Sequence, residues 1–229
     1  MQFALKRLVP PEQEPVDFGT MKSHLALDES YTADDALIQS MIASARSYIE
    51  NYTGRCLLPQ QWMLARDFFP AFRVGESAPA RSDFDALGNY NFNSWRSNDS
   101  QTIRIPKCPL ISVDSIKYMA DTSGTLTTLD PSLYQVDLLS EPGRVLPSPA
   151  AGCWPQTAPM ANAVQVTFTA GYADGGSVPD TIMQALRLTV AAWYSNRENF
   201  MLGVSGATEL PLGVCNLLDT EAVQPFGLY

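Results

Sequence analysis

The sequence predicts an α+β protein in which N- and C-terminal helices pack together as a small helical bundle, with a β-rich middle section inserted between them. Near both ends of the chain, apolar residues recur every three or four positions, as on one face of a helix. Between these regions, short stretches of alternating apolar and polar residues are separated by glycine and proline, as in strands and turns. Segregation of helices from strands along the chain is typical of α+β folds.

The N-terminal helix is expected after a flexible arm that is rich in proline and acidic residues. Thr32 and Asp35 fit the S/T-x-x-[DE] pattern of a helix start, and Gly54 suits the helix end because glycine readily adopts the left-handed conformation. The stripe between them could face the chain's own core, which we prefer, or a neighbouring subunit. It consists of Ile38, Met41, Ala45, Ile49 and Tyr52.

The C-terminal helix is expected to follow a strand over residues 164–169 and a turn at Ala170-Gly171-Tyr172. Pro179 suits the first helical position because the amide hydrogen that it lacks would be unpaired there, and Asp180 favours the positive end of the helix dipole. We expect this helix to pack on the N-terminal one. Its apolar face consists of Ile182, Leu186, Val190 and Trp193.

The middle section contains several short segments with strand character, and Asp121-Thr122-Ser123-Gly124 is expected to form a turn between two of them. The expected strands lie around Trp62 to Phe68, Ile103 to Ile105, Val113 to Met119, Leu133 to Val136, Val145-Leu146 and Val164 to Thr169.

These patterns divide the chain into parts of one structural unit. The expected parts are a flexible N-terminal arm (1–17), an N-terminal helical part (18–56), a β-rich section (57–170) with a long loop at 71–100, a C-terminal helical part (171–218) and a tail (219–229).

The chain is acidic, with 15 lysines and arginines against 24 aspartates and glutamates and a net charge of −9. Tight binding to nucleic acids depends on cationic side chains that displace phosphate counterions, so an acidic chain is not expected to bind DNA tightly. No apolar run approaches the ~18 residues of a membrane span, and the first residues have too short an apolar core for a signal peptide. We therefore expect a cytosolic protein without a membrane partner.

The sequence offers no set of catalytic residues, and we expect no enzymatic activity, no cofactor and no metal site. His24 is the only histidine, and the four cysteines form no C-x-x-C pair, so buried free thiols are the preferred interpretation. No nucleophile elbow, phosphate loop or zinc helix motif is present. The glycine-rich stretch 171–176 lacks the lysine of a phosphate loop, and the acidic pair Asp34-Asp35 is better explained by a helix start.

The long loop at 71–100 has little periodicity, and its aromatic residues are interleaved with asparagine and serine. Loops of this length are uncommon in compact domains unless they are functional or disordered. The loop is either a tolerated insertion or a protruding arm whose aromatics dock on another subunit or partner. Stacking on sugars is the alternative, which would make the chain a carbohydrate- or receptor-binding module. The candidate interface residues are Phe84, Tyr90, Phe92 and Trp95.

A short amphipathic helix is expected after Pro211, followed by a tail that contains apolar residues. The segment either docks onto a partner, which is the preferred hypothesis, or folds back onto the chain's own core. The candidate interface residues here are Leu212, Val214, Leu217, Leu218 and Phe226.

Several short motifs occur in an order that resembles the head-to-tail connector (adaptor) proteins of tailed bacteriophages and prophages. The resemblance covers residues 18–70 and 101–218, and the loop at 71–100 departs from the family pattern. The motifs are Pro106 to Val113, Tyr118 before a glycine turn, Leu129 to Val136, Trp154-Pro155, Ala170-Gly171-Tyr172, Val178-Pro179, and Trp193-Tyr194 with Asn196-Arg197-Glu198.

This resemblance implies a structural virion protein that forms a ring beneath the portal, extends the DNA channel and presents a platform for head-closure or tail proteins. Its implied partners are the portal protein, a head-closure or tail-completion protein, further copies of itself in a ring that matches the twelvefold portal, and passing double-stranded DNA that it does not bind tightly. The implied location is the head–tail junction of the virion, after assembly in the bacterial host cytoplasm.

Overall fold

The computed structural model describes residues 3–70, 101–195 and 212–223. Contacts divide this part of the chain into two compact units, and each unit is built from stretches far apart in sequence. The strand unit comprises residues 3–9, 61–70, 101–106 and 110–169, and the helical unit comprises residues 10–60, 107–109, 170–195 and 212–223.

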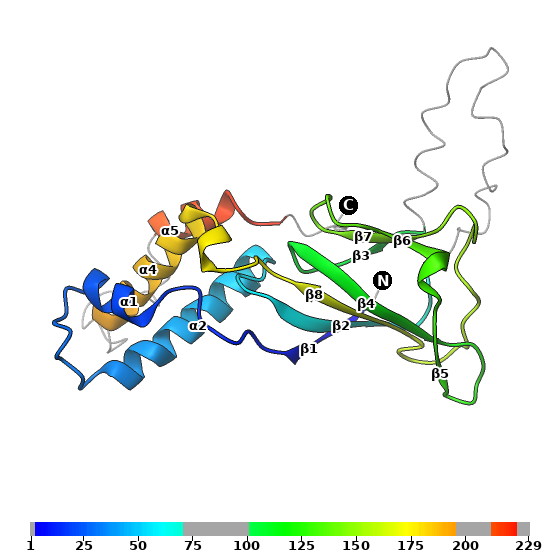
Figure 1. Cartoon of the computed structure of the whole chain (residues 1–229), viewed down its shortest axis with the longest axis horizontal. Helices are drawn as coiled ribbons and strands as arrows, with labels where there is room; N and C mark the ends of the chain where they lie inside the picture. The colour runs from blue at the N-terminus through cyan, green and yellow to red at the C-terminus, as the bar shows by residue number, and fades with distance from the viewer. Residues whose placement is uncertain (1–2, 71–100, 196–211, 224–229) are drawn as a thin grey trace, which may run out of the picture. The chain divides into compact units, whose positions relative to one another are not determined.

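The helical unit is a small bundle in which α4 packs against α1, α2 and α5 (Figure 1). Its apolar core draws on all four helices and includes Ile38, Ile49, Leu186 and Leu218. The predicted pairing of N- and C-terminal helices is therefore confirmed. The helices are α1 (Phe18–His24), α2 (Asp35–Thr53), α4 (Asp180–Ser195) and α5 (Leu212–Asp219), and a short 3-10 helix, η3, covers Gly175–Ser177.

The predicted capping pattern at the start of α2 is wrong. Asp34 is the N-cap residue, and its side chain does not cap the helix. Instead, the Asp34 carboxylate accepts hydrogen bonds from the hydroxyls of Tyr31 (3.1 Å) and Tyr194 (2.7 Å). Thr32 contributes only its carbonyl oxygen, which accepts from the Asp35 amide. At the other end, Gly54 has φ of 73° and ends α2 as predicted.

The buried stripe of α2 also differs from the predicted one at two positions. Ile42 is buried, whereas Met41 is only partly buried and Tyr52 is exposed. Ile38, Ile42, Ala45 and Ile49 follow one another at steps of four, three and four residues and form a straighter stripe.

Helix α4 begins one residue later than predicted, at Asp180. The carbonyl oxygen of Pro179 accepts hydrogen bonds from the amides of Ile182 (3.0 Å) and Met183 (3.1 Å), so Pro179 lies just before the first helical residue. The preceding turn needs glycine, because Gly171 has φ of 140° and a Cβ there would lie 2.1 Å from the carbonyl oxygen of Leu58.

The strand unit contains a five-stranded sheet in the order β1-β2-β8-β4-β5 and a three-stranded sheet in the order β3-β7-β6 (Figure 1). The predicted turn at 121–124 joins β4 to β5, which pair antiparallel. The strands are β1 (Ala4–Val9), β2 (Gln60–Arg66), β3 (Ile103–Arg104), β4 (Leu110–Met119), β5 (Leu126–Thr128), β6 (Tyr134–Asp137), β7 (Arg144–Pro147) and β8 (Val164–Ala170), with a 3-10 helix, η2, at Pro131–Leu133.

Strand β1 corrects the expectation of a flexible arm over residues 1–17. It pairs antiparallel with β2, with Leu5 opposite Leu64 and Arg7 opposite Trp62. The Arg7 guanidinium also lies 5.9 Å from the Trp62 ring centroid, a cation–π distance. The prolines and acids that suggested an arm come after this strand, so they describe the connection into the helical unit rather than the strand itself.

The buried side chains of the strand unit come from strands of both sheets. Gly143 is packed so closely that a Cβ there would lie 2.6 Å from Leu110 Cδ2. On the same unit, Trp154 stacks on Phe69 with ring centroids 4.8 Å apart, and its indole nitrogen donates to the Gln101 carbonyl oxygen at 2.7 Å. The fully buried side chains include Leu64, Ile103, Ile105, Ile116 and Phe168.

Candidate functional site

Of the candidate interface residues near the C-terminus, two have buried side chains and one is partly buried. Val214 and Leu218 are 1% and 0% exposed and belong to the core of the helical unit, which is the alternative that the sequence left open. Leu217 is partly buried against the same core. These buried side chains are not presented to a partner, so the docking role predicted for this segment would fall on Leu217 and on residues after 223.

Hydrogen bonds also connect α5 and the residues after it to α2 and to Arg55, which follows α2. The Tyr52 hydroxyl donates to the Asp219 carboxylate at 2.6 Å, and the amide of Val223 donates to the Thr53 carbonyl oxygen at 2.8 Å. Arg55 Nε donates to the carbonyl oxygen of Glu221 at 2.7 Å. Helix α5 is thus an integral part of the helical unit.

A buried polar cluster around Glu50 joins three segments of the helical unit. The Glu50 carboxylate accepts from Arg46 Nη1 (3.1 Å), the amide of Leu57 (2.9 Å) and Gln60 Nε2 (2.5 Å). Arg46 also bonds Glu14 at 2.8 Å. Burial alone would lower the pKa of Arg46, but hydrogen bonding to Glu14 and the charges of Glu50 and Glu14 raise it. The cluster therefore holds the segment before α1 and the segment after α2 on the same helix.

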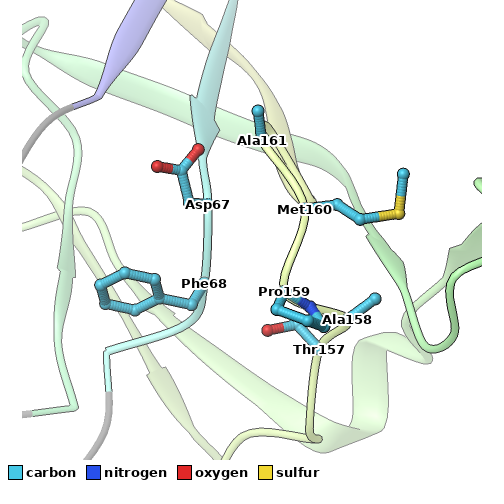
Figure 2. Close-up of a pocket in the computed structure, with 7 residues that line it drawn as sticks. All are labelled: Asp67, Phe68, Thr157, Ala158, Pro159, Met160 and Ala161. Atoms are coloured by element: carbon cyan, nitrogen blue, oxygen red, sulfur yellow. The ribbon is translucent and has the colours of Figure 1, made fainter.

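A shallow pocket of about 430 Å³ lies at one end of the strand unit. Figure 2 shows Asp67 and Phe68 on one segment and residues 157–161 on the facing segment. Most of the lining residues are apolar, but in Figure 2 the side chains of Phe68 and Met160 point away from each other, to the outer sides of the two segments. The Asp67 carboxylate accepts a hydrogen bond from the backbone amide of Asn162 at 2.9 Å.

The hairpin between β6 and β7 carries two exposed leucines at its tip. Leu139 is 97% exposed and Leu138 is 48% exposed. The sequence analysis missed both the tip and the pocket. Adjacent leucines in the stretch DLLSEPG, among residue types that otherwise favour turns, were a signal for the tip, whereas a pocket formed by two distant segments leaves no local pattern.

The remaining predicted interface residues cannot be placed. Phe84, Tyr90, Phe92, Trp95 and Phe226 lie outside the described residues, and Leu212 is described only as the first residue of α5. The roles of the loop at 71–100, as an assembly arm or as a sugar-binding surface, therefore remain predictions.

Across residues 3–70, 101–195 and 212–223, no three His, Cys, Asp or Glu side chains form a group that could hold a metal ion. Cys56 and Cys108 are buried, as expected, whereas Cys153 is exposed and Cys215 is partly exposed. Among the helices of the described chain, none is long and apolar enough to cross a membrane.

Comparison with known proteins agrees with this picture. The family of phage gp6-like head-tail connector proteins matches residues 17–116. Residues 17–116 belong to the phage head–tail connector family. This match runs from α1 through β2 into β4 and therefore includes segments of both units. The resemblance that the motifs indicated is confirmed, and no curated protein matches the chain.

Solved structures similar to this chain extend the likeness in fold to its whole length. The neck of an empty GTA particle, computed with C6 symmetry, matches with a TM-score of 0.67 and 19% identity over 99% of this chain and 98% of that one. A chain from the virion of a native gene transfer agent (GTA) particle has a TM-score of 0.66 and 18% identity over 98% of both chains. A third, from the neck of a native GTA particle computed with C12 symmetry, has 0.58 and 20%, covering 100% and 99%. These similarities show that the whole chain has the same fold as the matched chains.

Proposed function

We propose that this protein is a structural subunit of a head–tail connector ring, which docks beneath the portal, extends the DNA channel and presents a platform for head-closure or tail proteins. The observation that carries this proposal is the match of residues 17–116 to the connector family. The ring is supported by the particle necks with the same fold, which were computed with C6 and C12 symmetry. We therefore propose twelve copies per ring, to match the portal.

The charge of the chain suits a channel through which DNA passes. With a net charge of −9, its surface gains little from phosphate contacts, so DNA would slide rather than remain bound. A ring also explains how modest contacts suffice for assembly, because closure makes each subunit bind two neighbours and repeats every contact around the ring. No enzymatic step is needed for this role.

Native mass spectrometry of the purified protein, alone and mixed with the portal protein, tests the proposal. We expect a complex with the portal that contains a ring of connector subunits, and the same subunit number in assembled particles. Free portal with an unrelated acidic protein of similar size is the control for non-specific association. A protein that stays monomeric and never associates with portals or particles would contradict the proposal.

A further inference from the structure

The chain passes between the helical unit and the strand unit five times, and every passage meets the helical unit at one of four short segments. The segments cover residues 10–17, 54–60, 107–109 and 170–172, and the passages follow Val9, Gln60, Pro106, Pro109 and Thr169. Proline lies within two residues of four of these passages, as Pro10, Pro59, Pro106 and Pro109. Because its ring restricts φ to about −65°, proline leaves little backbone freedom in these connections.

One buried side chain, that of Glu50 on α2, connects two of these segments. Its carboxylate accepts hydrogen bonds from the Leu57 amide (2.9 Å) and from Gln60 Nε2 (2.5 Å), both in segment 54–60. It also accepts from Arg46 Nη1 at 3.1 Å, and Arg46 Nε in turn donates to Glu14 in segment 10–17 at 2.8 Å. Glu50 thus holds the first two passages on a single helix.

The other two segments join the same network. Lys107 Nζ donates to the backbone carbonyl oxygen of Glu50 at 3.4 Å. The amide of Gly171 donates to the carbonyl oxygen of Pro109 at 2.9 Å, and a Cβ at Gly171 would lie 2.1 Å from the carbonyl oxygen of Leu58. Segment 170–172 therefore lies directly on segments 107–109 and 54–60, so all five passages are linked to Glu50.

The network is both buried and charged. Glu50 is 3% exposed, and Arg46 and Lys107 are each 7% exposed. Charges buried in this way add little net stability over apolar side chains of the same volume. They can nevertheless specify one arrangement of the chain, because any other arrangement leaves a buried charge without its partner. The network is therefore suited to fixing the positions of the four segments.

We propose that the Glu50 network is a conformational lock that holds the five passages together and so restricts movement of the strand unit relative to the helical unit. Movements between domains are absorbed by a few residues in the connections, and here those residues are bound to one another. A subunit that is ordered before assembly loses less conformational entropy when it binds its partners. The lock is a property of the single chain, so its failure would leave the proposed ring untouched.

A distance measurement between the two units tests the lock. In a Cys215→Ser background, nitroxide spin labels are attached to Cys153, which is exposed in the strand unit, and to Ser44→Cys, at an exposed position of α2. Pulsed electron paramagnetic resonance then gives the distribution of distances between the labels. We expect one narrow distribution in this parent protein and a distribution at least about twofold broader in Glu50→Gln, which keeps the side-chain shape but removes the charge.

Two further variants separate the lock from a general loosening of the helical unit. Asp35→Asn is the matched control, because it also removes a carboxylate of α2 that pairs with a buried cation, Lys22, and it should leave the distribution narrow. Glu14→Gln should broaden the distribution less than Glu50→Gln does, because it releases only segment 10–17. The Glu14 side chain is 34% exposed, so this variant should remain folded.

The reactivity of Cys56 and Cys108 toward a maleimide shows whether the helical unit stays folded, because both thiols are fully buried in it. A distribution as narrow in folded Glu50→Gln as in the parent would overturn the lock. A broad distribution in the parent, or equal broadening in Asp35→Asn, would also overturn it. If both thiols of Glu50→Gln become reactive, that variant has unfolded, and an unchanged distribution in Glu14→Gln would then overturn the proposal.

Discussion

The hydroxyl of Tyr52 on α2 lies 2.6 Å from the carboxylate of Asp219 at the end of α5, and this hydrogen bond joins residues 167 positions apart. The bond to Asp219 raises the pKa of Tyr52 to about 12, because an ionised phenol could no longer donate and would face the carboxylate charge. The bond therefore contributes to stability below the ordinary tyrosine pKa of ~10, and this contribution is lost as the pH rises through about 12.

Replacement of Asp219 by asparagine should return the pKa of Tyr52 toward its ordinary value. The measurement is an ultraviolet titration of tyrosine ionisation, with Tyr52→Phe to identify the titrating group and Tyr48→Phe as the matched control. An unchanged titration curve in Asp219→Asn would show that the bond does not persist in solution.

Truncation of the two buried apolar side chains of α5 should destabilise the helical unit. Val214→Ala and Leu218→Ala leave cavities in a closed core, and we expect Leu218→Ala to lower the free energy of unfolding by about 2–5 kcal/mol and Val214→Ala by somewhat less. Denaturant unfolding measures this loss, and Gly213→Ala, where the added methyl meets no neighbour within 4 Å, is the control.

Truncation of the chain after Gly206 should accordingly lower the melting temperature, because it removes α5 from the core. The sequence alone left both alternatives open and favoured docking onto a partner over packing against the chain's own core. A truncated protein with the full melting temperature that no longer binds portals would restore the docking hypothesis.

Trp193→Ala should cost less than a fully buried tryptophan would. Trp193 is only partly buried and meets Tyr48 edge to face, with ring centroids 6.4 Å apart. Complete burial corresponds to about 3–5 kcal/mol on truncation, so we expect roughly 1.5–3 kcal/mol here. Thermal unfolding of Trp193→Ala beside Tyr48→Ala tests the estimate. A loss of ring formation at unchanged stability would place Trp193 in a subunit interface instead.

Purified protein should not retain duplex DNA at physiological salt, given its net charge of −9 and a longest basic run of only Lys6-Arg7. A mobility-shift titration over a range of salt concentrations is the measurement, with a basic DNA-binding protein as the positive control. Submicromolar binding would contradict a passive channel.

Replacement of residues 78–98 by a short glycine-serine linker should leave the chain folded, because loop closure depends only weakly on loop length. If Phe84, Tyr90, Phe92 and Trp95 dock on a partner, ring formation or portal binding should weaken in this variant, as measured by native mass. Normal assembly combined with loss of glycan or cell binding would instead support the carbohydrate- or receptor-binding alternative.

Helical periodicity predicted the fold well because it records which side chains meet the core. The stripes of α2 and α4 were identified closely enough to predict that the two helices pack together, and Gly54 marked the end of α2. Strand β1 was missed because ALKRLV shows no strict alternation, and an edge strand exposed along most of its length needs none.

The candidate site was less accessible from sequence for two physical reasons. Periodicity marks Val214 and Leu218 as one apolar face but does not say whether that face meets the chain's own core or another protein. The exposed leucines of the β6–β7 hairpin and the pocket beside Phe68 depend on tertiary placement, which brings the hairpin to one end of β4 and two distant segments to the other end.

The helical unit draws on both ends of the described chain, and this order has a consequence for synthesis on the ribosome. Helix α2 ends at Thr53 and its main packing partner α4 begins at Asp180, a separation of 180 − 53 = 127 residues. At ~5–20 residues per second, the apolar stripe of α2 waits about 6–25 s for α4 to be made. We expect nascent chains halted before Asp180 to recruit chaperones that bind exposed apolar segments. Chains halted well past α4 should have released these chaperones. Equal recruitment at both points would contradict this expectation.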